Sequence, residues 1–100
     1  MGLEPMTEVH QRNAVAEAAK LAAELPRLLK EAKARGDRVR SLYYIRKEWN
    51  VYHDVVAAEL LRRCAALGVV ASLTKGEAVG LDLESRPCTG MYGIVTVEIL

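Results

Sequence analysis

The sequence predicts a single α+β domain in which N-terminal helices pack on a small C-terminal three-stranded antiparallel sheet. Three observations predict it. Residues 7–67 are mainly alanine-rich or helically spaced apolar segments. Residues 69–100 instead carry short β-branched runs separated by turn residues. The chain has 100 residues and no Phe, so it fits one domain whose modest core depends on Trp49 and the tyrosines.

The N-terminal part predicts two helices after a flexible leader at residues 1–6. Thr7 is a suitable N-cap for a helix that continues to Leu25, and Pro26 is suited to the first turn of a second helix. Gly36 then ends the second helix as a left-handed C-cap residue. The small apolar stripe should let another helix approach closely; it comprises Val15, Ala18 or Ala19, Ala22, Leu25, Leu28 or Leu29, and Ala32.

The next stretch, residues 41–68, has apolar residues three or four positions apart. This spacing favours one helical face and predicts helix from about Ser41, either continuous to Gly68 or broken near Asn50. An alternation of Val39, Tyr43 and Ile45 is typical of a strand instead, but the longer run favours helix. The eight positions of that run are Leu42, Ile45, Trp49, Tyr52, Val56, Leu60, Cys64 and Leu67.

The C-terminal part predicts strands at residues 69–73, 79–84 and 91–100, with a turn at 74–77 and a loop at 85–90. Three consecutive strands with short connections make an antiparallel meander. If the last strand lay at an edge it would invite pairing with a second copy. Burial within the chain's own sheet is the alternative.

No segment has the roughly 18 apolar residues that a membrane span needs. The N-terminus does not read as a signal peptide, and two cysteines do not make a disulfide framework. We therefore expect a cytoplasmic protein without a membrane partner. His10, His53, Cys64 and Cys88 lack the close pairs of a zinc site, and nucleotide-binding and hydrolase motifs are absent. These observations predict no metal, no cofactor and no catalytic residue.

Charge is unevenly distributed along the chain. Residues 27–47 hold eight basic side chains against two acidic ones, although the whole chain has a net charge of only +1. Basic residues followed by aromatic ones suit phosphate neutralisation and base stacking. A solvated helix face with local ion pairs is the plainer interpretation. The predicted DNA- or RNA-binding residues are Arg35, Arg38, Arg40, Tyr43, Tyr44, Arg46 and Lys47.

The segment LLRRCAALGVVASLTKGEAVGLDLE, about a quarter of the chain, resembles the third helix and wing of winged-helix DNA-binding domains. In that resemblance residues 41–49 are the preceding helix and residues 50–53 the turn. It implies a helix–turn–helix and DNA binding. Asp54 and Glu59 oppose that function, because they would face phosphates.

The leading hypothesis is therefore a small, non-enzymatic nucleic-acid-binding protein that forms a homodimer. The alternative is a protein–protein interaction or regulatory module, also homodimeric, with no nucleic-acid role. A small enzyme that uses His53 is a third hypothesis; His53 and Asp54 are adjacent, so on a helix they diverge by about 100°.

Overall fold

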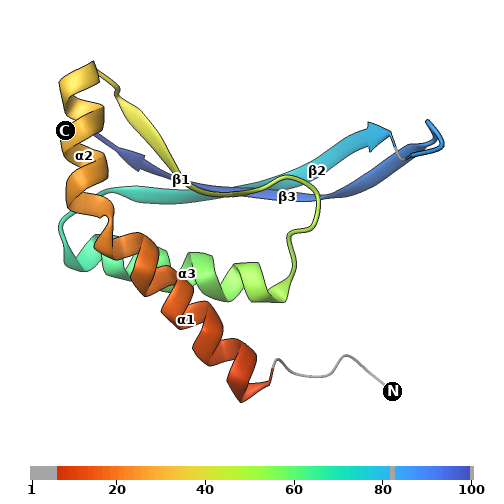
Figure 1. The fold of residues 1–100 in the computed structure, drawn as a ribbon, viewed down its shortest axis with the longest axis horizontal. Helices are drawn as coiled ribbons and strands as arrows, with labels where there is room; N and C mark the ends of the chain where they lie inside the picture. Colours follow the sequence, from red (N-terminus) through yellow and green to blue (C-terminus); the bar gives the residue numbers. More distant parts are fainter. Residues whose placement is uncertain (1–6, 82, 100) are drawn as a thin grey trace.

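The structure of the chain is a computed structural model that describes residues 7–81 and 83–99. Two helices precede the first strand, and a third helix precedes the other two strands of an antiparallel three-stranded sheet. This arrangement confirms the α+β class. Helices α1 and α3 lie against one face of the sheet, and α2 stands beside one end (Figure 1). The leader predicted for residues 1–6 is outside the described residues. The elements are α1 (Glu8–Ala23), α2 (Leu25–Arg35), β1 (Val39–Ile45), α3 (Val51–Ala66), β2 (Ala71–Leu81) and β3 (Pro87–Glu98).

Local capping chemistry defines the first two helices. The Thr7 hydroxyl accepts a hydrogen bond of 3.2 Å from the backbone N–H of His10, so Thr7 is the predicted N-cap. Pro26 lies in the first turn of α2, and Gly36 ends that helix with φ at +79°. Both predicted helices are confirmed, with α1 ending two residues earlier than expected.

The alanine stripe packs α1 directly on α3. Ala14, Ala18 and Ala22 are buried, with Ala14 in place of the predicted Val15, and their small side chains let the two helices approach closely. The predicted helix–helix contact is therefore confirmed, and the partner is a helix of the same chain. From α3 the buried residues are Val56, Ala57, Leu60 and Cys64.

The helix predicted from Ser41 is wrong, because residues 39–45 form the strand β1. The register with β3 shifts between Ser41 and Tyr43, which marks a β-bulge. The extra residue directs both Leu42 and Tyr43 toward the helices, so a strand imitates helical spacing. The only helix of this stretch is α3, whose N-cap Asn50 accepts a 2.9 Å hydrogen bond from the Tyr52 N–H.

The helix–turn–helix implied by the winged-helix resemblance is consequently absent from residues 41–67, which the structure describes throughout. One strand and one helix occupy this range. The wing hairpin that the resemblance places after the helix, with its turn at residues 74–77, is absent as well, because Ala71–Leu81 is one strand, β2, whose hairpin partner is β3.

The sheet has the order β1-β3-β2, so the predicted meander of three consecutive C-terminal strands is wrong. Strand β2 runs straight through residues 74–77, the predicted turn, because each of them pairs with β3. Strand β3 begins at Pro87, which shortens the predicted loop. Strand β3 is central, and its part from Gly93 to Val97 is paired on both sides, so this part offers no edge to a second copy.

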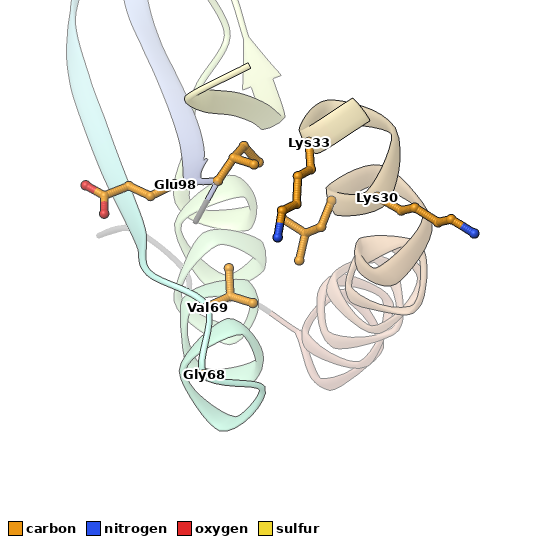
Figure 2. Close-up of a pocket in the computed structure, with 7 residues that line it drawn as sticks. Lys30, Lys33, Gly68, Val69 and Glu98 are labelled. Carbon is orange, nitrogen blue, oxygen red and sulfur yellow. The ribbon is translucent and has the colours of Figure 1, made fainter. Parts of the chain in front are cut away.

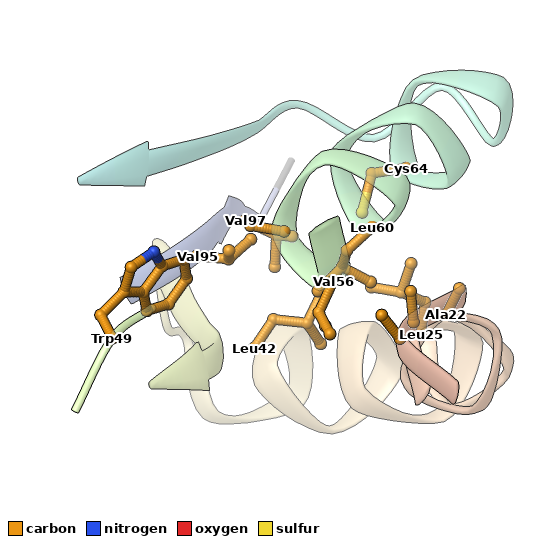
Figure 3. Packing of buried hydrophobic residues seen from close by; sticks show 12 residues of the cluster. Ala22, Leu25, Leu42, Trp49, Val56, Leu60, Cys64, Val95 and Val97 are labelled. Carbon is orange, nitrogen blue, oxygen red and sulfur yellow. The ribbon is translucent and has the colours of Figure 1, made fainter. Parts of the chain in front are cut away.

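The core lies between the sheet and the two helices. Val95 and Val97 of β3 meet Val56 and Leu60 of α3 at its centre (Figure 3). Leu25, Leu42 and Trp49 complete the buried cluster around them. This arrangement uses one face of the sheet only.

Candidate nucleic-acid interface

The predicted basic residues lie at the end of α2, along β1 and just after it. Arg35 forms an ion pair with Asp37, with 3.8 Å between Nε and Oδ2. The side chains of Arg38, Arg40 and Arg46 form no ion pair or hydrogen bond with the residues that the structure describes. Arg40 pairs with the buried Val97 and so lies on the helix-covered face, whereas Arg38 and Arg46 are exposed. Arg38 and Arg46 are therefore the members of the set best able to meet an external anion.

Strand β1 sends its two tyrosines to opposite faces of the sheet. Tyr43 pairs with the buried Val95, whereas Tyr44 pairs with Ile94 on the other face. The Tyr43 ring packs between the sheet and the helices, and its centroid lies 5.9 Å from that of the Trp49 ring. Burial raises the pKa of the Tyr43 hydroxyl. Tyr44 is 54% exposed. Of the two tyrosines predicted to stack on bases, only Tyr44 is placed to do so.

The face of the sheet that carries Tyr44 has no helix over it (Figure 1). We call it the open face. One cross-strand row on it consists of Tyr44, Ile94 and Thr74, and Tyr92 lies two residues along β3 from Ile94. The Tyr92 ring rests over Gly76, directly opposite on β2, where a Cβ would leave no room for it. Tyr44 and Tyr92 are thus diagonal neighbours on adjacent strands.

A row of hydroxyl groups lies beside the Tyr44 row on the open face. Ser41, Thr96 and Ser72 form the next cross-strand row, and the hydroxyl oxygens of Ser72 and Thr96 are 3.3 Å apart. Glu98, at the end of β3, is the one carboxylate that the register places on this face within the described strands. Negative charge is therefore sparse beside the two tyrosines.

Lys47 brings a cation to the same face. Its Nζ lies 3.6 Å from the Sγ of Cys88, which pairs with Gly80 across the ribbon of β2 and β3. The chain at Lys47 also packs against Gly90, where a Cβ would collide with the Lys47 carbonyl group. Residues 46–50 then wrap around the ribbon and descend to α3 (Figure 1). Two glycines without side chains thus let Lys47 lie against the ribbon.

Beneath the sheet, Asp54 joins three elements. Its Oδ1 accepts hydrogen bonds from Trp49 Nε1 at 2.8 Å and from Lys75 Nζ at 2.9 Å. These bonds, that from Trp49 foremost, hold the pKa of Asp54 below its usual value. The Lys75 ammonium of β2 is thereby occupied on the helix side and is unavailable to the open face.

His53 has the environment of a helix cap. Its Nδ1 accepts a 3.1 Å hydrogen bond from the Asn50 N–H, which completes the capping box of α3. The rings of Tyr43, Trp49 and Tyr52 lie 5.5–6.2 Å from its own. These contacts give His53 a structural role at the start of α3. The Asp54 carboxylate is hydrogen-bonded to Trp49 and Lys75 instead of His53.

Tyr92 is the residue of the open face that the sequence analysis missed. It lies in Gly90-Met91-Tyr92-Gly93, which reads as a loop merging into a strand. The alternation of Ile94, Thr96 and Glu98 with Val95 and Val97 is the signal that could have placed it. Extended backward by two residues, that alternation puts Tyr92 on the wet face.

The comparisons with known proteins identify no relative: no family model, curated protein or solved structure matches this chain. Within residues 7–81 and 83–99, no helix is long and apolar enough to cross a membrane. The same residues contain no group of three or more His, Cys, Asp or Glu side chains that could hold a metal ion. The case for function therefore depends on the open face.

Proposed function

We propose that this chain is a small non-enzymatic protein that binds single-stranded DNA or RNA on the open face. The observation that supports the proposal is the pair of diagonal neighbours Tyr44 and Tyr92 on an uncovered sheet. An aromatic ring on such a face stacks on a base, and it tolerates any sequence because every base has a π-face. Ile94 and the surrounding hydroxyl groups add apolar and hydrogen-bonding contacts.

Cations at both ends of β1 suit the sugar–phosphate backbone. Arg38 lies one residue before β1 and Arg46 one residue after it, at the two ends of the strand that carries Tyr44. Both are exposed, and neither has an ionic partner among the described residues. Lys47 supplies a third positive group farther along the ribbon. Each phosphate neutralised by such groups releases counterions, which makes binding salt-dependent.

A single strand fits this surface better than a duplex. A duplex is read by an element that enters a groove, and the helix–turn–helix that would supply one is replaced by β1 and α3. Helix α3 packs its apolar side against α1 and the sheet. The flat open face instead suits unpaired bases that can lie on tyrosine rings.

The test is fluorescence anisotropy of labelled oligo-dT, oligo-U and a duplex of equal length, titrated with protein at several salt concentrations. The single strands should bind more tightly than the duplex. Tyr44→Ala should weaken binding by about 1–3 kcal/mol, the range for loss of one base–aromatic stack. Circular dichroism should show that the variant remains folded.

A double variant tests the phosphate contacts. Arg38→Ala with Arg46→Ala should reduce the slope of log K against log salt by about 1.4, since each contact to a single strand contributes about 0.7. The matched control, Arg12→Ala with Lys20→Ala, removes the same charge from exposed positions on α1. Equal weakening of binding by both pairs of substitutions would show that the effect comes from net charge and not from Arg38 and Arg46 themselves. Absence of binding at low salt would overturn the proposal.

A protein-interaction role is the second candidate, and the far end of the β2–β3 ribbon favours it. The ribbon projects beyond the helices (Figure 1). It exposes the apolar side chains Val79, Leu81, Leu83 and Met91. Exposed apolar groups gathered on one element are typical of interaction surfaces. Sedimentation equilibrium would detect a homodimer, and Leu81→Glu should dissociate it if the ribbon forms the interface.

A further inference from the structure

A pocket of about 430 Å³ lies at the opposite end of the fold from the ribbon tip, between α2 and the ends of β2 and β3. Its volume lies within the range of about 300–1,000 Å³ that is common for small-molecule sites. Glu98 is the one residue of the open face in its lining, and Tyr44 and Tyr92 do not contribute to it. The residues that line it are Leu29, Lys30, Lys33, Gly68, Val69, Glu98 and Ile99 (Figure 2).

Backbone hydrogen bonds hold the apolar lining in place. Gly68 turns the chain out of α3 with φ at +75°, and the Val69 N–H then donates to the Cys64 carbonyl at 2.8 Å. On the other strand the Ile99 N–H donates to the Arg38 carbonyl, also at 2.8 Å. Val69 is therefore anchored to α3 and Ile99 to the segment before β1, with the pocket between them and α2.

The polar side chains of the lining are not equivalent. Figure 2 shows the Lys33 ammonium directed toward the pocket, whereas Lys30 extends into solvent on the far side of α2. The Glu98 carboxylate also points away from the pocket (Figure 2). Lys33 has no ion pair or hydrogen bond with any residue in the described part of the chain. The pocket thus presents one unpartnered cation above an apolar lining.

We infer that this pocket binds a free medium-chain fatty carboxylate. The carboxylate would accept a charge-assisted hydrogen bond from Lys33, and the alkyl chain would lie against Leu29, Val69 and Ile99. Each methylene removed from water should strengthen binding up to about fourfold, so affinity should rise with chain length. A nucleotide is a poor match, because the lining offers no aromatic ring. This inference is independent of the proposed nucleic-acid role.

The probe for the experiment is decanoate, followed by ¹H–¹⁵N correlation NMR of the whole chain. Decanoate should shift the amide signals of Val69 and Ile99 at concentrations below about 1 mM. Acetate, which has the charge without the chain, should cause no shift over the same range. Decanol, which has the chain without the charge, should bind at least about tenfold more weakly, because it cannot offer Lys33 a charged acceptor.

Two lysine variants separate the pocket from general surface charge. Lys33→Met should reduce decanoate affinity about tenfold, whereas Lys20→Met removes the same charge from an exposed position on α1, outside the pocket lining, and should leave the affinity unchanged. Both side chains are exposed, so both variants should fold like the parent. The inference is overturned if the two variants lose affinity equally, if decanol matches decanoate, or if decanoate shifts signals on the open face instead.

Discussion

Replacing Gly93 by alanine should destabilise the fold through Trp49. A Cβ at position 93 would lie closer than 3.0 Å to three carbons of the indole ring, a separation that real Cβ atoms essentially never show. The ring is only 8% exposed and cannot simply rotate into solvent. Tyr43 contacts the ring edge-on, and the Trp49 Nε1 donates a hydrogen bond of 2.8 Å to Oδ1 of Asp54. Trp49 must therefore leave its site or push β3 away.

The expected loss of stability has two parts. Forcing extra volume into a packed site costs about 1–3 kcal/mol. Withdrawal of the ring also breaks its hydrogen bond to the Asp54 carboxylate, which contributes about 1 kcal/mol or more. We expect a total of about 2–4 kcal/mol, or a decrease in Tm on the order of 10–25 °C for a domain of this size.

Trp49 is the only tryptophan in the chain, so its fluorescence reports on this site alone. Urea unfolding followed by emission and by circular dichroism gives the free energy, and the native emission of Gly93→Ala should shift to the red. Gly80→Ala is the matched strand control, because its new Cβ would meet only the flexible Lys47 ammonium end. That variant should change stability by less than about 1 kcal/mol. Equal effects from the two substitutions, or unchanged emission in Gly93→Ala, would refute the reasoning.

Three other perturbations test the supports of the fold. Asp54→Asn removes the charge that Trp49 and Lys75 stabilise. Because the pKa of Asp54 is lowered in the folded state, its contribution is complete above the ordinary value of 3.8 and is lost as pH falls through the folded-state pKa. Urea unfolding from pH 7 to pH 3 should therefore show a flatter acid limb in the variant; an unchanged limb would contradict the assignment. Leu60→Ala opens a cavity at a fully buried position and should cost about 2–5 kcal/mol, measured by the same unfolding curves. Gly36→Ala places a side chain at φ +79° and should lower stability by about 1 kcal/mol, with a gain in Tm counting against the αL cap.

Part of the candidate site was predictable from the sequence. The cluster of basic residues at positions 27–47 and Tyr44 were identified from charge and residue type, both of which are local properties. Their relation to one another was not predictable. Tyr43 and Tyr44 look alike in the sequence, and only their pairing with Val95 and Ile94 assigns one to the core and the other to the open face.

The sequence by itself determined the capping of the first two helices. Thr7 and Gly36 act within one turn of their own helices, so their roles follow from neighbouring residues. The alanine stripe likewise specified a close helix–helix contact before its partner was known. Short-range chemistry of this kind is encoded where it acts.

Only the tertiary structure decided the sheet. Residues 39–45 and 74–77 become strand because β3, far along the chain, supplies their hydrogen-bond partners. The bulge at Leu42 then places adjacent side chains on the same face, so the spacing of apolar residues does not identify this segment as a strand. Strand pairing is a contact between distant segments, and a one-residue change in register moves every side chain to the other face. The open face and its pair of tyrosines exist only once that register is set.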